Sequence, residues 1–360
     1  MENILIVGAG LTGCVLANKL LEKNNKYNIL IIDKRNHIGG NCYDYYDNGI
    51  LMNKYGAHIF HTNNEMVWNY VNKFDEWIPW YHKVIGKIDN KLFPIPVNNN
   101  TVKILLSEDY KIIKNTISNP SNSEETCINN VGEDLYKLIF KEYTYKQWAK
   151  YPNELDSSVL ARIPIREDNN PNYFNDKYQA LPKNGYTKFI GKLINHPNIV
   201  VKLNTEFDKD THTKFNKIFF TGPIDHYYNH LQLPKLEYRS INFVKEYLDV
   251  DYFQENSVVN YPQHETNNEK TPWTRIIEYK HFYNQKVPNK TIIVKEMTTD
   301  VGDPYYPIPT KRNQELYLEY QKEAKKDEVN NIYFLGRLGS YKYLNMDQAI
   351  EQAILFAEKF

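Results

Sequence analysis

The feature that most constrains the fold is a glycine-rich turn close to the N-terminus. The apolar run from Asn3 to Val7 is typical of a buried strand, and a turn containing Gly8, Gly10 and Gly13 follows it directly, before a helical pattern. In a strand–turn–helix unit of this kind, glycines allow a tight turn and let the backbone approach a pyrophosphate, which the helix N-terminus faces. The sequence therefore predicts a dinucleotide site.

A second apolar run, from Asn28 to Ile32, strengthens this prediction. It ends in Asp33, whose carboxylate can accept hydrogen bonds from a ribose diol. The segment that follows contains the adjacent glycines Gly39 and Gly40, and it resembles the second fingerprint of the large FAD-binding family that includes glutathione reductase and the amine oxidases. This resemblance favours FAD over NAD.

The C-terminal end of the chain carries a similar unit. An apolar run from Ile332 to Leu335 precedes Gly336 and Arg337, and a helix is predicted over residues 345–360. The start of such a helix can face the pyrimidine edge of a flavin and stabilise negative charge on its reduced form. We therefore expect both ends of the chain to build one nucleotide-binding domain around inserted material.

The middle of the chain divides into two patterns. Residues 101–160 are mostly helical in pattern, most clearly from Val131 to Phe140, although the polar stretch 118–130 is expected to be a surface loop. Between residues 163 and 309, short apolar runs alternate with turns, which predicts an antiparallel sheet. The expected fold is α/β: a Rossmann-like FAD-binding domain (1–80, 184–235 and 310–360), a helical subdomain (98–160) and an antiparallel β-sheet subdomain (81–97, 161–183 and 236–309).

Composition excludes several classes of protein. The 360 residues include 44 Lys and Arg against 44 Asp and Glu, so the chain lacks the basic excess of a nucleic-acid binder. An aromatic content of 14% argues against disorder, and no apolar run reaches membrane-spanning length. Three dispersed cysteines, Cys14, Cys42 and Cys127, support neither a disulfide framework nor a metal site, and we expect a cytoplasmic protein with reduced cysteines.

Seven segments distributed along the chain are informative together: Lys34 to Asn41, Lys54 to Thr62, Lys146 to Trp148, Arg162 to Arg166, Thr274 to Glu278, Pro304 to Pro307 and Gly336 to Leu338. In this order, and over the whole length of the chain, they resemble the UDP-galactopyranose mutase family, whose members contract the sugar ring of UDP-galactose.

The resemblance implies a role for each matching residue. Arg162 and Arg275 match two arginines that bind the diphosphate, a task for which bidentate guanidinium groups are suited. His58 matches a histidine that lies against the flavin. The implied catalytic residues are His58, Arg162, Arg275, Tyr306 and Tyr343, and the implied substrate-binding residues are Tyr143, Trp148, Arg162, Tyr173, Asn260, Arg275, Tyr306, Tyr343 and Asn345.

The implied cofactor site combines the glycine turns with residues of three matching segments. Its members are Gly8, Gly10, Leu11, Thr12, Gly13, Asp33, Lys34, Arg35, Gly39, Gly40, Asn41, His58, Ile59, Arg337 and Met346.

Two features depart from the family pattern. Asn345 stands where the family commonly has an aspartate, and an amide cannot act as a general base, although it can cap the following helix. The segment from Asn260 to Arg275 is a few residues longer than usual, so the match of Asn260 to an asparagine near the uracil is the weakest of the set.

The resemblance also implies a mechanism and partners. In it, reduced FAD attacks the anomeric carbon through N5, displaces UDP and forms a flavin–sugar adduct, through which the ring opens and recloses without net redox. We expect a nucleotide-sugar substrate, an external reductant such as NAD(P)H, no metal, and a homodimer or higher homo-oligomer. Alternatives are an FAD oxidoreductase of the amine-oxidase type, a catalytically silent flavin or nucleotide-sugar binder, and a mutase acting on UDP-N-acetylgalactosamine or another nucleotide sugar.

Overall fold

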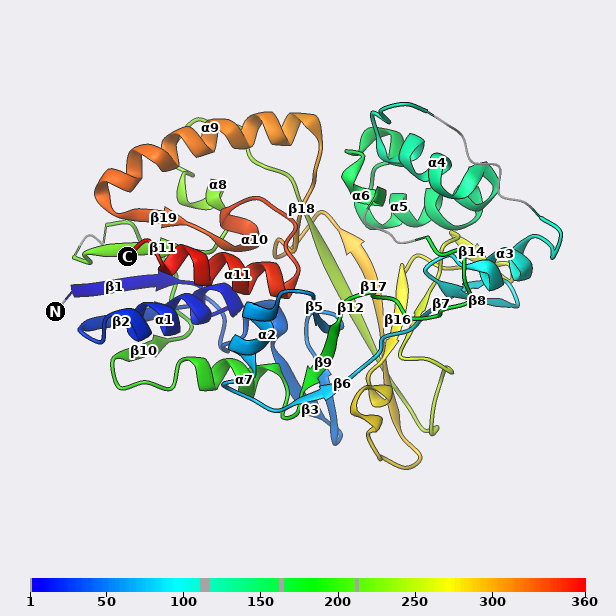
Figure 1. The fold of residues 1–360 in the computed structure, drawn as a ribbon, viewed down its shortest axis with the longest axis horizontal. Coiled ribbons are helices and arrows are strands. Elements are labelled where there is room, and N and C mark those ends of the chain that lie inside the picture. The colour runs from blue at the N-terminus through cyan, green and yellow to red at the C-terminus, as the bar shows by residue number, and fades with distance from the viewer. Residues whose placement is uncertain (1, 111–116, 162–164, 211–213) are drawn as a thin grey trace.

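The computed structural model describes residues 2–110, 117–161, 165–210 and 214–360. Figure 1 shows three regions: a parallel sheet covered by helices, which holds both chain ends, a long twisted sheet beside it, and a group of short helices near the far end of that second sheet. The described part of the chain contains no helix that is both long and apolar enough to cross a membrane.

The first sheet is parallel, and three separate stretches of the chain supply its strands. Its sequences are almost continuously apolar because helices cover both faces: Ile4 and Ile6 of one strand face one layer, while Leu5 between them faces the other. In spatial order the strands are β10 (Ile199–Lys202), β2 (Tyr27–Ile32), β1 (Glu2–Val7), β11 (Lys217–Phe220) and β19 (Ile332–Phe334).

Helices from both chain ends cover this sheet. On one face α1 (Leu11–Lys23) packs against the C-terminal helix α11 (Met346–Ala357) and against α7 (Tyr186–Leu193), with α2 (Glu65–Val71) beside α11. On the other face α8 (Ile224–Tyr227) and α9 (Lys311–Asp327) bury aromatic side chains against β11. The Rossmann-like α/β arrangement predicted from the glycine turn is thus confirmed, although α11 is shorter at both ends than the predicted helix.

The second sheet has seven strands, and all but one pair of neighbours are antiparallel. The exception is β7, which runs parallel to β13, with Ile85 opposite Val259. No local sequence pattern indicates this parallel direction of β7. It follows from the path of the chain, in which the β7–β8 hairpin precedes the helical insertion. In order the strands are β18 (Tyr306–Pro307), β12 (Tyr238–Leu248), β17 (Thr291–Thr299), β16 (Arg275–Glu278), β13 (Val258–Asn260), β7 (Val84–Ile88) and β8 (Lys91–Ile95).

Smaller sheets connect these two regions. They are the β3–β4 hairpin (Asp44–Asp47 and Ile50–Asn53), a three-stranded sheet of β5 (Phe60–Thr62), β9 (Tyr178–Pro182) and β6 (Trp77–Pro79), and the short hairpin of β14 (Glu265–Thr266) and β15 (Glu269–Lys270).

The helical region corrects two sequence expectations. Residues 118–130 are not wholly a loop, because α4 (Ser123–Leu135) begins there: the Asn122 side chain caps it by accepting a 3.0 Å hydrogen bond from the Glu125 amide. The predicted helix from Val131 to Phe140 is interrupted at Gly132, whose φ is 78°, and continues as a π-helical turn over Tyr136–Phe140. The other helices are α3 (Asn99–Leu105), α5 (Lys141–Trp148) and α6 (Ser158–Ala161).

Candidate functional site

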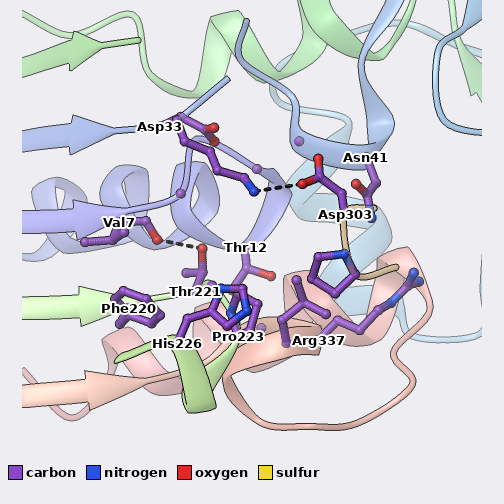
Figure 2. Close-up of a pocket in the computed structure, with 18 of the residues that line it drawn as sticks. Val7, Thr12, Asp33, Asn41, Phe220, Thr221, Pro223, His226, Asp303 and Arg337 are labelled. Carbon is purple, nitrogen blue, oxygen red and sulfur yellow. Dashed lines mark hydrogen bonds and ion pairs between the residues drawn. The ribbon is translucent and has the colours of Figure 1, made fainter. Parts of the chain in front are cut away.

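A cavity of about 780 Å³ opens at the carboxyl ends of the parallel strands. The residues that follow β1, β2, β10, β11 and β19 all contribute to its lining, so it lies where open α/β sheets commonly bind ligands. Figure 2 shows Asp33, Thr221 and Arg337 around it, each from a different part of the chain. Its volume falls within the usual range of ligand pockets, roughly 300–1,000 Å³.

Two glycine turns pack against each other at this cavity. Gly40 has a φ of +55°, and a Cβ atom added to it would lie 2.9 Å from the Gly10 Cα, which is too close for any side chain. The Gly39 amide donates a 2.8 Å hydrogen bond to the Ala9 carbonyl and holds the two turns together. Backbone rather than side chains therefore forms this wall, as close approach of a pyrophosphate requires.

Charged side chains lie next to these two glycine turns. Asp33 accepts 2.8 Å hydrogen bonds from the amides of Ala9 and Arg35. Asp303, from the second region, forms ion pairs of 2.7 Å with Lys34 and 3.1 Å with Arg35. Burial opposes ionisation of Asp303, but these two cations outweigh it and lower its pKa. Asp303 lines the cavity and had no recognisable local signal in the sequence.

Several other lining residues also escaped the sequence analysis. They lie at 205–207, after β10, and at 220–235, after β11. The sequence did contain a signal for the second group of lining residues. The apolar strand that ends at Phe220 is followed directly by Thr221 and Gly222, so it is a further strand followed by a glycine. The Thr221 hydroxyl donates to the Val7 carbonyl over 2.8 Å and ties this turn to the first one (Figure 2).

His58 lies at the inner edge of the cavity and is neutral near pH 7. Burial lowers the pKa of His58 to about 4, with Arg337 and Arg275 adding to the effect. Its Nδ1 lies 2.8 Å from the Gly56 carbonyl oxygen, which can only accept, so Nδ1 carries the proton and Nε2 is left as an acceptor.

Beyond His58, three neighbouring strands of the second sheet place a row of polar side chains side by side. Asn260 on β13 pairs in register with Arg275 on β16, which pairs with Glu296 on β17. The Arg275 guanidinium lies 2.7 Å from the Glu296 carboxylate. Burial raises the pKa of Glu296, and Arg275 opposes that rise. Among the described residues, the buried Asn260 Oδ1 has no hydrogen-bond partner, so this row can still accept a donor.

Arg337 connects the cavity with this row. It lines the cavity, donates a 2.6 Å hydrogen bond to the Leu344 carbonyl, and lies over the rings of Tyr306 and Tyr343, 5.3 and 5.0 Å from their centroids. These two rings stack with centroids 5.5 Å apart. Burial, with Tyr343 beside it, raises the pKa of Tyr306 to about 12, so its hydroxyl keeps its proton near neutral pH.

Three further predicted substrate residues, Tyr143, Tyr173 and Trp148, lie in different environments. Burial opposes the charge on Arg275, but Glu296 outweighs it and, with smaller contributions from Tyr143, Tyr306 and Tyr173, holds the pKa of Arg275 above its ordinary value. Trp148 is only 4% exposed and meets Tyr306 edge-on, with centroids 6.4 Å apart.

Nine of the predicted site residues that the structure describes do not line the large cavity, and Arg162 lies outside the described residues. The nine are Gly13, Ile59, Tyr143, Trp148, Tyr173, Asn260, Arg275, Tyr306 and Tyr343. Gly13 supports the turn, since a Cβ there would lie 2.2 Å from the Gly8 carbonyl oxygen. Ile59 packs on an apolar cluster of the second region, and the Tyr343 ring lies under Arg337, which does line the cavity. Arg162 belongs to the segment 162–164, for which no structure is described. By contrast Leu11, Thr12, Asn41 and Met346, predicted for the cofactor, and Asn345, predicted for the substrate, all line the cavity.

These features define a class of protein: one with a Rossmann-like dinucleotide-binding domain, joined to a second sheet that carries a half-buried arginine paired with a buried glutamate. Comparison with known families agrees, since residues 6–74 match the NAD(P)-binding Rossmann-like domain and residues 138–343 match the model of UDP-galactopyranose mutase. The chain belongs to the UDP-galactopyranose mutase family, a family of isomerases.

Individual relatives support this assignment. The chain is 38% identical to a probable UDP-galactopyranose mutase of Klebsiella pneumoniae, over 100% of this chain and 94% of the relative. It is also 38% identical to the dTDP-fucopyranose mutase of Escherichia coli, over 100% and 98% of the two chains. Among solved structures, the crystal structure of reduced UDP-galactopyranose mutase superposes with a TM-score of 0.80 at 15% identity, covering 99% and 95% of the two chains.

Proposed function

We propose that this chain binds FAD in the large cavity and, with the flavin reduced, interconverts UDP-galactopyranose and UDP-galactofuranose without net redox. The observation that carries the proposal is the position of Arg275: its half-buried side chain pairs in strand register with Asn260, whose buried oxygen has no partner among the described residues, and it is close enough to His58 to lower the pKa of that histidine. A diphosphate at Arg275 would leave the attached sugar close to the inner edge of the cavity.

The residues of the cavity fit FAD. The wall of Gly10 and Gly40 leaves room for a pyrophosphate only because neither residue has a side chain, and the amino end of α1 faces that space. Asp33 would accept from a ribose hydroxyl, and the amino end of α11 would lie near the flavin ring. Reduced FAD, when bound, supplies the nucleophile that displaces UDP from the anomeric carbon.

The side chains of the second sheet would hold the substrate rather than perform bond chemistry. Arg275, together with the predicted Arg162, would bind the diphosphate and keep UDP in place after it leaves the sugar, so that it can return. Glu296 fixes the orientation of the Arg275 guanidinium. His58 would accept a hydrogen bond through Nε2 and would not carry a charge near neutral pH.

Asn345 has no general-base role in this proposal. Asn345 precedes α11, and its backbone N–H donates a 3.0 Å hydrogen bond to the Gln348 side-chain oxygen, as expected of a residue that starts a helix. Its side chain can still hydrogen-bond a hydroxyl of the sugar or the cofactor.

The nucleotide sugar itself requires a direct test, because a dTDP-fucopyranose mutase is as similar to this chain as a UDP-galactopyranose mutase is. Dithionite-reduced protein should be incubated with UDP-galactopyranose, UDP-N-acetylgalactosamine and dTDP-fucopyranose, and the products separated by chromatography. We expect the furanose form of UDP-galactose, with many turnovers for each reduction. Turnover of dTDP-fucopyranose alone would change the substrate, and reductant consumed in proportion to product would favour an oxidoreductase.

The cofactor has its own test. Acid precipitation of the purified, yellow protein should release FAD, with no flavin attached covalently. Release of FMN, or of no flavin, would contradict the cofactor assignment. We also propose NAD(P)H as a physiological reductant and a homo-oligomeric state, which stopped-flow reduction and light scattering, respectively, would test.

A further inference from the structure

A buried lysine outside the cavity has an unusual set of partners. Lys146, on α5, is 8% exposed, and its ammonium group donates to backbone carbonyl oxygens rather than to a carboxylate. The acceptors are Gln263 and Thr271, each at 3.0 Å, Trp273 at 2.8 Å, and Tyr261. A buried ammonium is costly unless all its donors are used, and here four acceptors surround three N–H groups.

All four carbonyls belong to one connection, the residues between β13 and β16. This is the segment that is longer than usual for the family. It folds into the β14–β15 hairpin, whose turn residues Asn267 and Asn268 have φ values of 52° and 60°. The connection begins one residue after Asn260 and ends one residue before Arg275. Its position therefore affects both strands that carry the proposed diphosphate and uracil contacts.

Other contacts fasten the same helix to the same segment. Gln263 Nε2 donates over 2.5 Å to the carbonyl of Leu138, in the π-helical turn that runs into α5, and the Glu142 carboxylate on α5 lies 2.8 Å from His264 Nε2. The Thr298 hydroxyl on β17 donates to the Lys146 carbonyl, so the backbone of α5 is tied to the sheet as well. Tyr143 and Trp148 lie on this helix, three residues before and two residues after Lys146.

We propose that Lys146 is a positioning residue for the nucleotide-diphosphate site. By gathering four carbonyls around one ammonium, it fixes the connection between β13 and β16 to α5, and so sets Tyr143 and Trp148 against Asn260 and Arg275. This inference rests on the proposed function only for the identity of the ligand. Without the ammonium, the carbonyls of Tyr261, Thr271 and Trp273 would lose this donor, whereas the Gln263 carbonyl would keep its hydrogen bond from the Thr271 hydroxyl. The helix and the two strands would then separate or shift.

The test is Lys146→Met, which keeps the length and apolar stem of the side chain but removes the ammonium. The control is Lys137→Met, a change in the same helical region at a side chain that is 59% exposed. We expect Lys146→Met to raise the dissociation constant of UDP, measured by calorimetry, and the KM of the nucleotide sugar by about tenfold or more. Its kcat at saturating substrate should stay within about threefold.

Flavin content separates positioning from general damage. Among the described residues, none between His58 and Thr205 lines the large cavity, so FAD bound per chain should be unchanged in Lys146→Met. Native-like UDP affinity in this variant would overturn the inference while leaving the proposed function intact. A native protein that binds FAD but not UDP would instead overturn the proposed function.

A milder variant keeps the inference testable if Lys146→Met does not fold. Gln263→Leu removes the hydrogen bond to Leu138 and leaves the ammonium in place. We expect its UDP affinity to fall by about threefold with unchanged FAD content. Unchanged UDP affinity in this folded variant would also contradict the proposal that Lys146 and its surrounding contacts position the nucleotide-diphosphate site.

Discussion

The glycine-lined cavity and the row of polar side chains on the second sheet are built in opposite ways. At the cavity, the wall is backbone: Gly10 and Gly40 meet where no side chain fits, and the residues that form each turn are neighbours in sequence. On the second sheet, Asn260, Arg275 and Glu296 come from three strands and meet only through strand register. The glycine-lined cavity is therefore sensitive to substitutions within a short stretch of sequence. The polar row on the second sheet depends instead on the alignment of segments that are distant in sequence.

Lys146 shows how the second site compensates for this dependence. A single ammonium ties the connection between two of those strands to α5, whereas the two glycine turns of the cavity pack backbone against backbone. The following predictions test this contrast between a backbone site and a side-chain site.

Changing the glycine contact should have the largest effect. A valine at position 40 would need a φ of +55° and would place its Cβ 2.9 Å from the Gly10 Cα, so Gly40→Val should push the two turns apart. We expect FAD affinity, measured by flavin absorbance after gel filtration, to fall about 1,000-fold or more, roughly 4 kcal/mol. Gly49→Val is the matched control: its φ is +82°, but its Cβ would meet only Val287 at 3.7 Å. Equal loss of FAD in both variants would show strain alone to be the cause.

Removing Arg275 should have the next largest effect. We expect Arg275→Ala to lower turnover by roughly 30- to 1,000-fold, or about 2 to 4 kcal/mol, because it removes a charged diphosphate contact and leaves Glu296 buried without its partner. Arg275→Lys separates the two causes, since it keeps the charge beside Glu296 but loses the guanidinium fork. Arg162→Ala should resemble Arg275→Ala. Trp148→Phe should cost less, about 1 to 2 kcal/mol, and steady-state kinetics that reverse this order would contradict the diphosphate assignment.

Acid should weaken the second region through His82, which is 4% exposed. Burial, together with Arg275 and His61, lowers the pKa of His82 from 6.5 to about 3. Between about pH 3 and pH 6.5, His82 binds a proton in the unfolded chain but not in the folded chain. The contribution of His82 to the free energy of unfolding therefore has its full value above pH 6.5 and falls as the pH drops below it. Between pH 6.5 and 4.5 the loss should be about 2 to 3 kcal/mol.

Urea unfolding at several pH values would measure it. His82→Gln should flatten the dependence by that amount, whereas His230→Gln, at an exposed histidine, should not. Identical pH dependence in the native protein and His82→Gln would contradict the neutral, buried state of His82.

Restoring the family's usual carboxylate should have the smallest effect. Asn345→Asp keeps a good helix-capping side chain at the start of α11 and adds a charge that the helix N-terminus tolerates. We expect turnover to change by less than about tenfold, or 1.4 kcal/mol of barrier. If the native protein were fully loaded with FAD but inactive, and Asn345→Asp restored turnover, a carboxylate would be essential and the native chain would be a silent binder.

The sequence predicted the parallel sheet better than the other regions. Continuous apolar runs and glycines report directly on buried strands and tight turns, so β1, β2, β19 and the lining residues next to them required only local information. The α4 helix was misjudged as a loop in part because its polar composition hid a cap at Asn122 and the buried Cys127. The parallel pairing of β7 with β13 had no local signal at all.

By itself, the sequence determined the nucleotide-binding turns, the α/β class and the family, because these depend on residues that are close together in the chain or on segments that match in order. The partners of the site residues were decided only by the tertiary structure. Asp303 beside Lys34, Glu296 beside Arg275, and the four carbonyls around Lys146 are contacts across 21 to 269 positions of the chain. Charges and carbonyls of this kind find one another through strand register and burial, which a single sequence does not display.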